Sequence, residues 1–215
     1  MKNIVIIGSG GFGREVAWLI SDINRKSKEW NILGFIDDNK KLHGEIINGY
    51  RVLGSFDFFK DKKDIYYVCA IGNAKVRKEI VDKKCSNFKI KAATLIHPSV
   101  IMSSEFNNIE EGCIICAGNI ITVNSKISRH TIINLDCTIG HDVVIGSFST
   151  IYPSVNISGN CTIGECCEVG TGSQIIQGIN IANNTIIGAG SVVIKDIEKN
   201  CVAVGAPAKV IKTNL

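Results

Sequence analysis

An aliphatic residue recurs at every sixth position through the second half of the chain. The series runs without a break from Ile109 to Val193, and each of its fifteen members is Ile or Val. A period of six fits neither the 3.6 residues of a helical turn nor the two-residue alternation of a strand. It indicates a solenoid in which three hexapeptides form one triangular coil, so that each aliphatic side chain stacks on its equivalents above and below.

A second column of residues supports the same phase. Four places after each aliphatic member the side chain is nearly always small or β-branched, as at Cys113, Ser125 and Cys137. We attribute this to the limited room inside a narrow prism. The residue directly after the aliphatic is often Gly, as at Gly140 and Gly146, and we expect it to turn a tight corner with a positive φ angle. The combined pattern predicts a left-handed parallel β-helix of hexapeptide repeats.

The repeat divides the chain into three parts. Residues 96–194 carry the hexapeptides, and residues 1–95 precede them. Residues 195–215 fall outside the period, and Pro207 in this tail lacks the N–H that a strand ladder requires. We expect the tail to cap the solenoid or to fold back along one of its faces.

The first part has the pattern of a small α/β domain. Apolar runs predict buried strands, and two of them lead into a residue spacing that is typical of a helix. The expected strands are 3–7, 32–36 and 65–70, and the expected helices are 14–23 and 74–81. The predicted fold class is therefore α/β plus β-solenoid, with a small Rossmann-like βαβ domain followed by the β-helix.

A glycine-rich loop of the form GxGxxG, Gly8 to Gly13, joins the first strand to its helix. Loop amides and a helix N-terminus together attract a phosphate group. Asp37 and Asp38 end the second strand and can accept hydrogen bonds from a ribose or from a base. About 95 residues are too few for a two-halved dinucleotide fold, so one nucleotide is a more economical ligand than a nicotinamide cofactor. A close-packed turn without a ligand is the alternative.

The adjacent pair His141 and Asp142 is the main candidate for catalysis, because few titratable side chains lie within the repeat. A neutral imidazole is the usual general base near pH 7, and a carboxylate partner orients it and raises its basicity. Gly159 lies one coil later. We expect its missing side chain to leave an opening beside the imidazole, and its N–H to face a developing oxyanion.

The other histidines and the cysteines have simpler interpretations. His130 has Phe148 one coil later, which favours ring packing. A three-histidine zinc site would require His97 as well as the two histidines of the repeat, and is disfavoured. Cys113 and Cys116 have CxxC spacing, but no second pair faces them, so we expect no metal.

Composition limits the classes of partner and location. The formal charge of +4 is mild and fits an anionic small molecule better than nucleic acid, which would call for a concentrated basic face. No apolar run reaches a transmembrane length, and the N-terminus lacks the pattern of a signal peptide. We therefore expect a cytoplasmic protein without a membrane or nucleic-acid partner.

Four motifs in this order resemble the bacterial sugar acetyltransferases of the NeuD and PglD type, over nearly the whole chain. They are GSGGFGRE from Gly8, FIDD at Phe35 to Asp38, AIGN at Ala70 to Asn73 with Arg77 after it, and VGAPAK at Val204 to Lys209, besides His141–Asp142 and the hexapeptides. The resemblance implies an enzyme that transfers acetyl from acetyl-coenzyme A to a sugar. It also implies a homotrimer with the cofactor cleft between neighbouring subunits.

The resemblance further implies roles for individual residues. His141 would be the general base, and Asp142 would raise its basicity. The nucleotide-sugar would be held by Gly10, Gly11, Phe12, Asp37, Asp38 and Gly72. The acetyl-coenzyme A cleft would be lined by Thr150, Thr171, Ala189, Ala206, Pro207 and Lys209. Members of the family often have His where Thr150 stands, so the contact expected from that ring is missing here. The position of Phe12 is polar in some relatives, and this difference bears on which sugar or base is accepted.

Several functions stay open on the sequence. The leading hypothesis is N-acetylation of a nucleotide-linked amino sugar, because a nucleotide cradle has no purpose with a free sugar. O-acetylation of sialic acid or of another sugar hydroxyl is the first alternative. A non-catalytic binding protein of the same fold and a zinc hydratase are the others.

Overall fold

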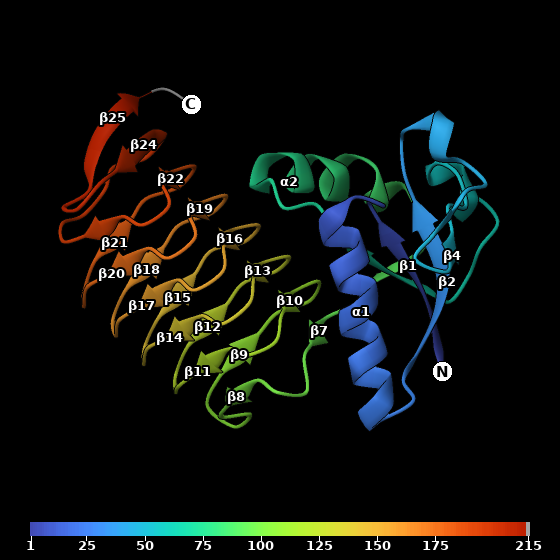
Figure 1. Cartoon of the computed structure of the whole chain (residues 1–215), viewed down its shortest axis with the longest axis horizontal. Coiled ribbons are helices and arrows are strands. Elements are labelled where there is room, and N and C mark those ends of the chain that lie inside the picture. Colours follow the sequence, from blue (N-terminus) through green and yellow to red (C-terminus); the bar gives the residue numbers. More distant parts are fainter. Residues whose placement is uncertain (214–215) are drawn as a thin grey trace. The chain divides into compact units, whose positions relative to one another are not determined.

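The computed structural model describes residues 1–213. The chain forms two compact units, Met1–Pro98 and a second unit that begins at Ser99. Each unit has its own core, and each is described here by itself (Figure 1). None of the helices in the described part of the chain is long and apolar enough to cross a bilayer.

The first unit is a parallel sheet with helices against it. The strand order is β2-β1-β5-β6, with β1 at Lys2–Ile7, β2 at Trp30–Ile36, β5 at Ile65–Cys69 and β6 at Lys91–Ala92. Helix α1 (Gly11–Lys26) follows β1, and α2 (Ala74–Lys83) follows β5. The predicted Rossmann-like βαβ arrangement is confirmed, with each predicted strand and helix present.

Burial explains why these segments form these elements. The β1 residues Ile4 to Ile7 are at most 2% exposed, as expected for a central strand covered on both faces. Helix α1 buries Val16, Leu19, Ile20 and Ile23 on one stripe. The remaining elements are short: η1 (Lys40–Leu42), β3 (Ile46–Ile47), β4 (Tyr50–Arg51), η2 (Phe56–Phe59), η3 (Cys85–Asn87) and β7 (Leu95–Ile96).

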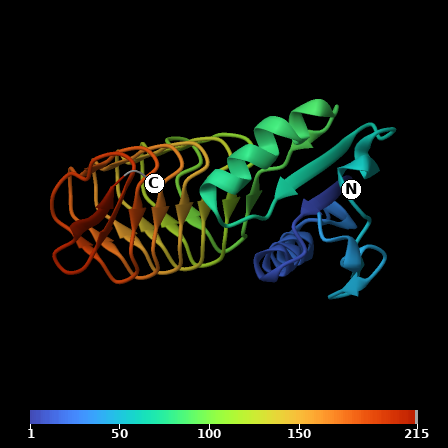
Figure 2. The same ribbon diagram turned by 90° about the horizontal axis from the view of Figure 1, so that it is seen from above.

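The second unit is a three-sided parallel β-helix whose coils stack along its length (Figure 2). One face contains β10 (Ile114–Ile115), β13 (Ile132–Ile133), β16 (Thr150–Ile151), β19 (Glu168–Val169) and β22 (Ile186–Ile187). The second face contains β8 (Ile101–Met102), β11 (Ile120–Ile121), β14 (Thr138–Ile139), β17 (Asn156–Ile157), β20 (Gln174–Ile175) and β23 (Val192–Val193). The third contains β9 (Asn108–Ile109), β12 (Lys126–Ile127), β15 (Val144–Ile145), β18 (Thr162–Ile163) and β21 (Asn180–Ile181).

The aliphatic column forms the core of this prism. Ile121, Ile139 and Ile157 are register partners on successive coils, as the eighteen-residue turn predicts. Every member of the series from Ile115 to Val193 is at most 2% exposed. The stacked aliphatic side chains therefore bury the interior, while backbone hydrogen bonds join each coil to the next.

The predicted reason for the corner glycines is wrong. Gly140 and Gly146 do not have a positive φ angle; that conformation occurs two residues later, for example at Asp142 and Phe148. Gly140 is needed for another reason, since a Cβ atom there would lie 2.6 Å from the backbone N of Gly159 in the next coil. Close approach of two backbones, rather than left-handed geometry, excludes a side chain at this position.

Hydrogen bonding also helps to select the small column. Ser125 Oγ donates to the carbonyl of Gly140, and Ser149 Oγ donates to that of Gly164, 15 residues further on in each case. Cys161 Sγ makes the same contact with the carbonyl of Ile176. Size alone does not explain why Ser, Thr and Cys recur here, because each also has a donor for a buried carbonyl.

The C-terminal segment extends one face of the prism. Strand β24 (Cys201–Val204) pairs in parallel with β22, and β25 (Lys209–Thr213) returns antiparallel along β24. Pro207 lies in the turn between the two strands, where no ladder N–H is needed. The last two residues of the predicted tail lie outside the described part.

Candidate functional site

His141 lies at the corner between β14 and β15, at the edge where the second and third faces meet. Its Nδ1 atom lies 2.8 Å from Oδ2 of Asp142. The two side chains are 54% and 46% exposed, so a substrate can reach them. The predicted pair is therefore present as a hydrogen-bonded contact on the outer edge of the prism.

The backbone explains why neighbouring residues can meet in this way. Asp142 has φ +58°, a left-handed conformation that Asp tolerates better than most residues. Hydrogen bonds from His141 and then from Asn124, one coil below, hold the pKa of Asp142 below its ordinary value. An ionised carboxylate only accepts, so Nδ1 of His141 carries the proton. Nε2 is then left with a free lone pair, which is the state that a general base requires.

Gly159 lies directly against the imidazole of His141. A Cβ atom at residue 159 would lie 2.5 Å from Nε2 and 2.5 Å from Cε1 of that ring. The expected opening beside the imidazole is therefore wrong, because the ring itself occupies the space that the missing side chain leaves. Gly159 is buried, and among the described residues no hydrogen-bond partner is found for its N–H.

Two other histidines have surroundings of their own. His130 is 2% exposed and stacks on Phe148, with ring centroids 5.2 Å apart, which confirms the packing interpretation. His97 lies in the first unit, where Nε2 is 3.2 Å from Oδ2 of Asp22. Within residues 1–213 no three His, Cys, Asp or Glu side chains gather closely enough to hold a metal ion.

The residues predicted to line the acetyl-coenzyme A cleft are exposed at the surface, with the exception of Thr150. Thr171 and Ala189 follow β19 and β22 on adjacent coils, so both lie at the edge between the first and second faces. The exposed residues Ala206, Pro207 and Lys209 belong to the turn and the start of β25, and the neighbouring Ala208 N–H donates to the carbonyl of Val192 on the second face. Thr150 differs, because it is 1% exposed.

The glycine-rich loop has the structure of a phosphate cradle. Gly10 precedes α1, and no side chain caps the helix there, so the first amides of α1 are open to an anion. Gly13 lies against the carbonyl oxygen of Gly8, where no Cβ atom would fit. Ser9 donates from both N and Oγ to Asp37 Oδ2, at 3.0 and 2.6 Å. These two hydrogen bonds tie the glycine-rich loop after β1 to Asp37, the residue that follows β2.

The environment of Asp37 favours its ionised form. Burial raises the pKa of this carboxyl, but the hydrogen bonds from Ser9 and Asn39 outweigh that effect and hold the pKa below its ordinary value. Asp37 therefore has a structural partner in the loop. The sequence predicted that Asp37 would contact a ribose or a base of the ligand. In the structure its hydrogen-bond partners are Ser9 and Asn39 of the chain itself.

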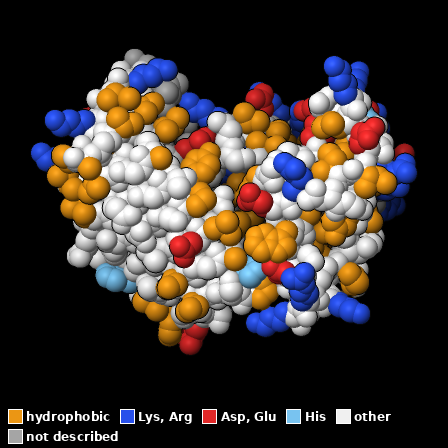
Figure 3. Space-filling model, viewed as in Figure 1, with side chains coloured by type: hydrophobic (Ala, Val, Ile, Leu, Met, Phe, Trp, Pro, Cys, Tyr) orange, Lys and Arg blue, Asp and Glu red, His pale blue; other side chains and the backbone are white. Residues whose placement is uncertain are grey.

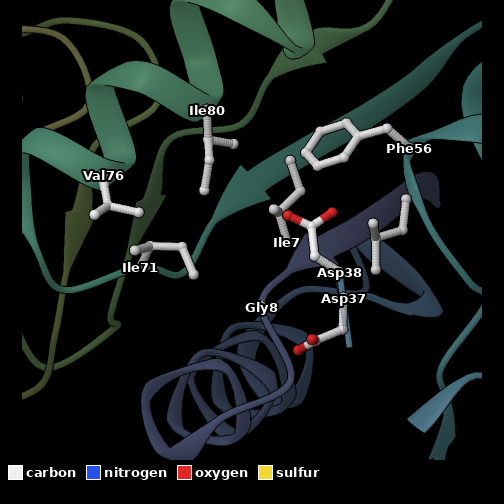
Figure 4. Close-up of a pocket in the computed structure, with 9 residues that line it drawn as sticks. Ile7, Gly8, Asp37, Asp38, Phe56, Ile71, Val76 and Ile80 are labelled. Atoms are coloured by element: carbon white, nitrogen blue, oxygen red, sulfur yellow. The ribbon is translucent and has the colours of Figure 1, made fainter. Parts of the chain in front are cut away.

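A cavity of about 210 Å³ lies at the carboxyl ends of the strands. Asp37 and Asp38 line it together with apolar side chains that include Phe56, Ile71 and Ile80. Figure 4 shows the Asp38 carboxylate pointing into the space between Ile80 and Phe56, whereas Asp37 points the other way, toward the loop after Gly8. Of the other predicted substrate residues, Gly11 lines a separate hollow with Arg14 and Trp18, and Gly10, Phe12 and Gly72 line neither.

Sequence reasoning missed the apolar walls of this cavity and one buried cation. Phe56 lies in an irregular segment that no strand or helix pattern marks. Arg77 is 1% exposed, and its Nη1 donates to the carbonyls of Ile71 and Gly72, at 2.5 and 3.0 Å. Its helical position at the start of α2 gave no sign that it fixes the loop after β5. Only the resemblance drew attention to it.

Comparison with known proteins agrees with this architecture. Residues 3–84 match the family described as PglD N-terminal domain. A GDP-perosamine N-acetyltransferase of Escherichia coli O157:H7 is 30% identical over 158 residues, which cover 72% of this chain and 69% of that protein.

Two solved structures are similar over almost the whole chain. The acetyltransferase domain of PglB from Neisseria gonorrhoeae superposes with a TM-score of 0.87 at 26% identity, covering 98% of this chain and 100% of that one. A histidine-to-asparagine variant of perosamine N-acetyltransferase from Caulobacter crescentus, in complex with CoA and GDP-perosamine, also has a TM-score of 0.87 at 26% identity and covers 99% and 98%. The predicted left-handed β-helix is confirmed, and the chain belongs to the NeuD/PglD-type family of acetyl-CoA-dependent sugar acetyltransferases.

Proposed function

We propose that the protein transfers an acetyl group from acetyl-coenzyme A to the amino group of a nucleotide-linked amino sugar, with His141 as general base. The observation that carries this proposal is the contact between His141 and Asp142, at 2.8 Å, on an exposed edge of the prism. A relative described as a GDP-perosamine N-acetyltransferase supports the choice of an amine acceptor.

The chemistry needs little more than alignment and one proton transfer, because a thioester is already activated. The amine nitrogen attacks the acetyl carbonyl carbon, and a C–N bond forms as His141 Nε2 takes a proton from the amine. The tetrahedral intermediate then breaks its C–S bond, and the imidazolium returns the proton to the leaving thiolate. General base catalysis of this kind contributes about 10²–10⁴-fold to the rate.

The open amide of Gly159 is the proposed oxyanion donor. It lies on the coil next to His141, and a Cβ atom at Gly159 would be 2.5 Å from the base nitrogen. Its N–H has no acceptor among the described residues, and we assign it to the oxygen that gains charge in the intermediate. Such a donor is typically worth about 10²–10³-fold.

The cavity of the first unit is the proposed nucleotide site. Its lining residue Gly8 begins the loop that leads to the uncapped N-terminus of α1, and an acidic residue, Asp38, points into the apolar pocket. Phosphates favour the first feature, and a base or ribose with hydrogen-bond donors favours the second. A free sialic acid would use neither, which is why N-acetylation of a nucleotide-linked sugar is preferred to O-acetylation.

A homotrimer is the proposed assembly, with acetyl-coenzyme A bound between copies. Thr171 and Ala189 lie at one edge of the prism and His141 at another, so a cofactor held at the first edge reaches a histidine most directly from a neighbouring copy. Exposed aliphatic side chains at Ile120 (41%) and Val123 (39%) supply apolar surface for such packing.

We also place the reaction in the cytoplasm. The nine cysteines are all unpaired and buried, which fits a reducing compartment. On the face seen in Figure 3, Lys and Arg side chains lie in several separate groups. An anionic small molecule fits this distribution better than nucleic acid does.

A direct assay tests the proposal. The purified protein is given acetyl-coenzyme A with a nucleotide-linked 4-amino sugar, with the matched 4-hydroxy sugar nucleotide, or with free sialic acid, and release of the coenzyme thiol is followed. We expect turnover with the amino sugar only. Acetylation of sialic acid with no reaction of the amino sugar nucleotide would overturn the proposal.

A further inference from the structure

Asn124 lies one coil before Asp142, on the same edge of the prism as His141. The strands that follow the two residues, β12 and β15, are parallel neighbours, so Asn124 and Asp142 occupy equivalent corners. The Asp142 N–H donates to the carbonyl of Val123 at 3.0 Å, which ties one corner to the other. The side chain of Asn124 makes a hydrogen bond with the Asp142 carboxylate. Asp142 therefore has a partner along the chain, His141, and another across the coils.

The direction of this second hydrogen bond follows from the chemistry of the two groups. An ionised carboxylate only accepts, so the donor is the side-chain amide of Asn124. The carboxylate is 46% exposed and also lies 2.8 Å from His141 Nδ1. A single contact between two exposed partners orients them weakly. A second donor, held on a different coil, restricts the rotation of the carboxylate and so steadies its contact with the ring.

The backbone at this corner does not by itself require Asn. Asn124 has φ +57°, in the left-handed region that Asn and Gly adopt most readily. Other corners of the prism nevertheless have Phe148, Ser154 and Cys166 in the same conformation, with φ between +54° and +61°. The amide of Asn124 therefore supplies something that the turn can do without, which is a donor beside Asp142.

We propose that Asn124 is a positioning residue for the general base, because its amide holds the Asp142 carboxylate in the orientation that accepts from His141 Nδ1. The inference rests on the proposed function, since it concerns the base of that reaction. Asn124 acts through Asp142 and takes no proton itself.

The orientation of the carboxylate decides between two tautomers of the His141 ring. A neutral imidazole carries its proton on Nδ1 or on Nε2, and the hydrogen bond made by one nitrogen sets which of them is protonated. With the Asp142 carboxylate in place, the proton stays on Nδ1 and the Nε2 lone pair can take a proton from the amine. When the carboxylate turns toward solvent, the ring can carry its proton on Nε2, and that fraction of the enzyme has no base.

Two substitutions at Asn124 separate this role from a role in the turn. Gly and Asp both tolerate the left-handed conformation, so the coil should keep its path. Asn124→Gly removes the donor, and kcat should fall roughly tenfold with both KM values unchanged, because a hydrogen bond to a charged group is lost. Asn124→Asp places a second negative charge beside Asp142 and should lose at least as much. Wild-type kcat in Asn124→Asp would show that the turn alone selects this residue.

Asn184→Gly is the matched control. Asn184 has φ +59° at a corner between the third and first faces, whereas His141 lies between the second and third. The same change of residue is thus made in the same backbone conformation at a different edge. We expect Asn184→Gly to keep the kcat of the wild type. An equal fall of kcat in the two glycine variants would mean that the fall reflects the fold, and would overturn the assignment.

Nitrogen NMR of protein with labelled histidines reads the tautomer directly. The chain has four histidines, and the His141 signals are those that disappear in His141→Asn. At a pH where the ring is neutral, Asn124→Gly should lower the fraction of the Nδ1–H tautomer, and Asn184→Gly should not. An unchanged tautomer in Asn124→Gly would overturn the proposal even if kcat fell.

A double-mutant cycle with Asp142→Ala shows whether Asn124 acts through Asp142. We expect Asn124→Gly to cause no further fall of kcat in the Asp142→Ala background, and a second fall of similar size there would contradict the proposal. If the wild-type protein acetylates no amino sugar nucleotide, the proposed function fails on its own. The NMR comparison still decides the inference in that case, because a lower Nδ1–H fraction in Asn124→Gly supports it and an unchanged fraction overturns it.

Discussion

Gly159 lies one coil above His141, and a Cβ atom on it would approach the imidazole Nε2 to 2.5 Å. The absence of a side chain at residue 159 therefore leaves the space that the His141 ring occupies. Gly159→Ala should push the ring away and lower kcat by about 10²-fold, because small displacements of a base have large effects. Its φ angle is not in the positive range, so the backbone should tolerate Ala.

Steady-state kinetics of Gly159→Ala check this prediction. Ser158→Ala is the control, because Ser158 is the exposed neighbour on the same coil and should keep wild-type turnover. Full activity of Gly159→Ala with an unchanged pH profile would show that the contact between residue 159 and the ring has no role.

Acidification should release the loop that Asp37 holds. The pKa of Asp37 in the folded protein is below its ordinary value of 3.8, so its hydrogen bonds stabilise the fold fully above that value. That contribution is lost as the pH falls through the lowered folded pKa. Asp37→Asn should therefore lower the melting temperature at pH 7, and the gap to wild type should narrow below about pH 3.8. A gap that is constant with pH would contradict the assignment.

Removing a donor from the interior column should destabilise the β-helix. Ser149 Oγ donates to the carbonyl of Gly164 at 2.6 Å and accepts from the Cys167 N–H at 3.0 Å, and Ser149 is fully buried. Ser149→Ala should reduce the free energy of unfolding by about 1–3 kcal/mol, since two buried groups lose their partner. Ser149→Cys should restore part of the loss. Thermal melts compare both with Thr162→Ala, a loss of a hydroxyl at an exposed position.

The buried guanidinium of Arg77 should matter for both stability and nucleotide binding. Arg77→Met keeps the apolar stem but leaves the carbonyls of Ile71 and Gly72 without this donor. We expect a loss of roughly 3 kcal/mol of stability and weaker nucleotide binding, because Ile71 lines the cavity. Lys75→Met on the exposed side of α2 is the control, and equal effects of the two variants in melting and titration experiments would refute this role.

The period of six predicts the β-helix so well because one constraint acts on every coil. Ile121, Ile139 and Ile157 must all fill the same column, so the pattern repeats and can be read from the sequence. The reason for Gly140 could not be read in this way. Its side chain is excluded by the backbone of Gly159, a residue nineteen positions away, and local turn chemistry gives no sign of that approach.

The candidate site likewise has one contact that the sequence predicts and one that it does not. His141 and Asp142 are adjacent in sequence, so their contact could be predicted from chemistry alone. Asp38 and Lys84 are 46 residues apart, and the sequence did not predict the 2.7 Å contact between Asp38 Oδ2 and Lys84 Nζ. Long-range contacts of this kind have no periodic signature, and the sequence alone therefore showed the acidic pair without its partner.

Turnover of His141→Asn tests the central claim most directly. Single-turnover acetylation of the amino sugar nucleotide is compared between this variant and the wild type, with the affinities for acetyl-coenzyme A and for the nucleotide measured in parallel. The account predicts a fall in rate of about 10²–10⁴-fold with both affinities kept within a few-fold, because Asn cannot take the proton. A rate within a few-fold of wild type, with both ligands bound, would contradict the assignment of His141 as the base.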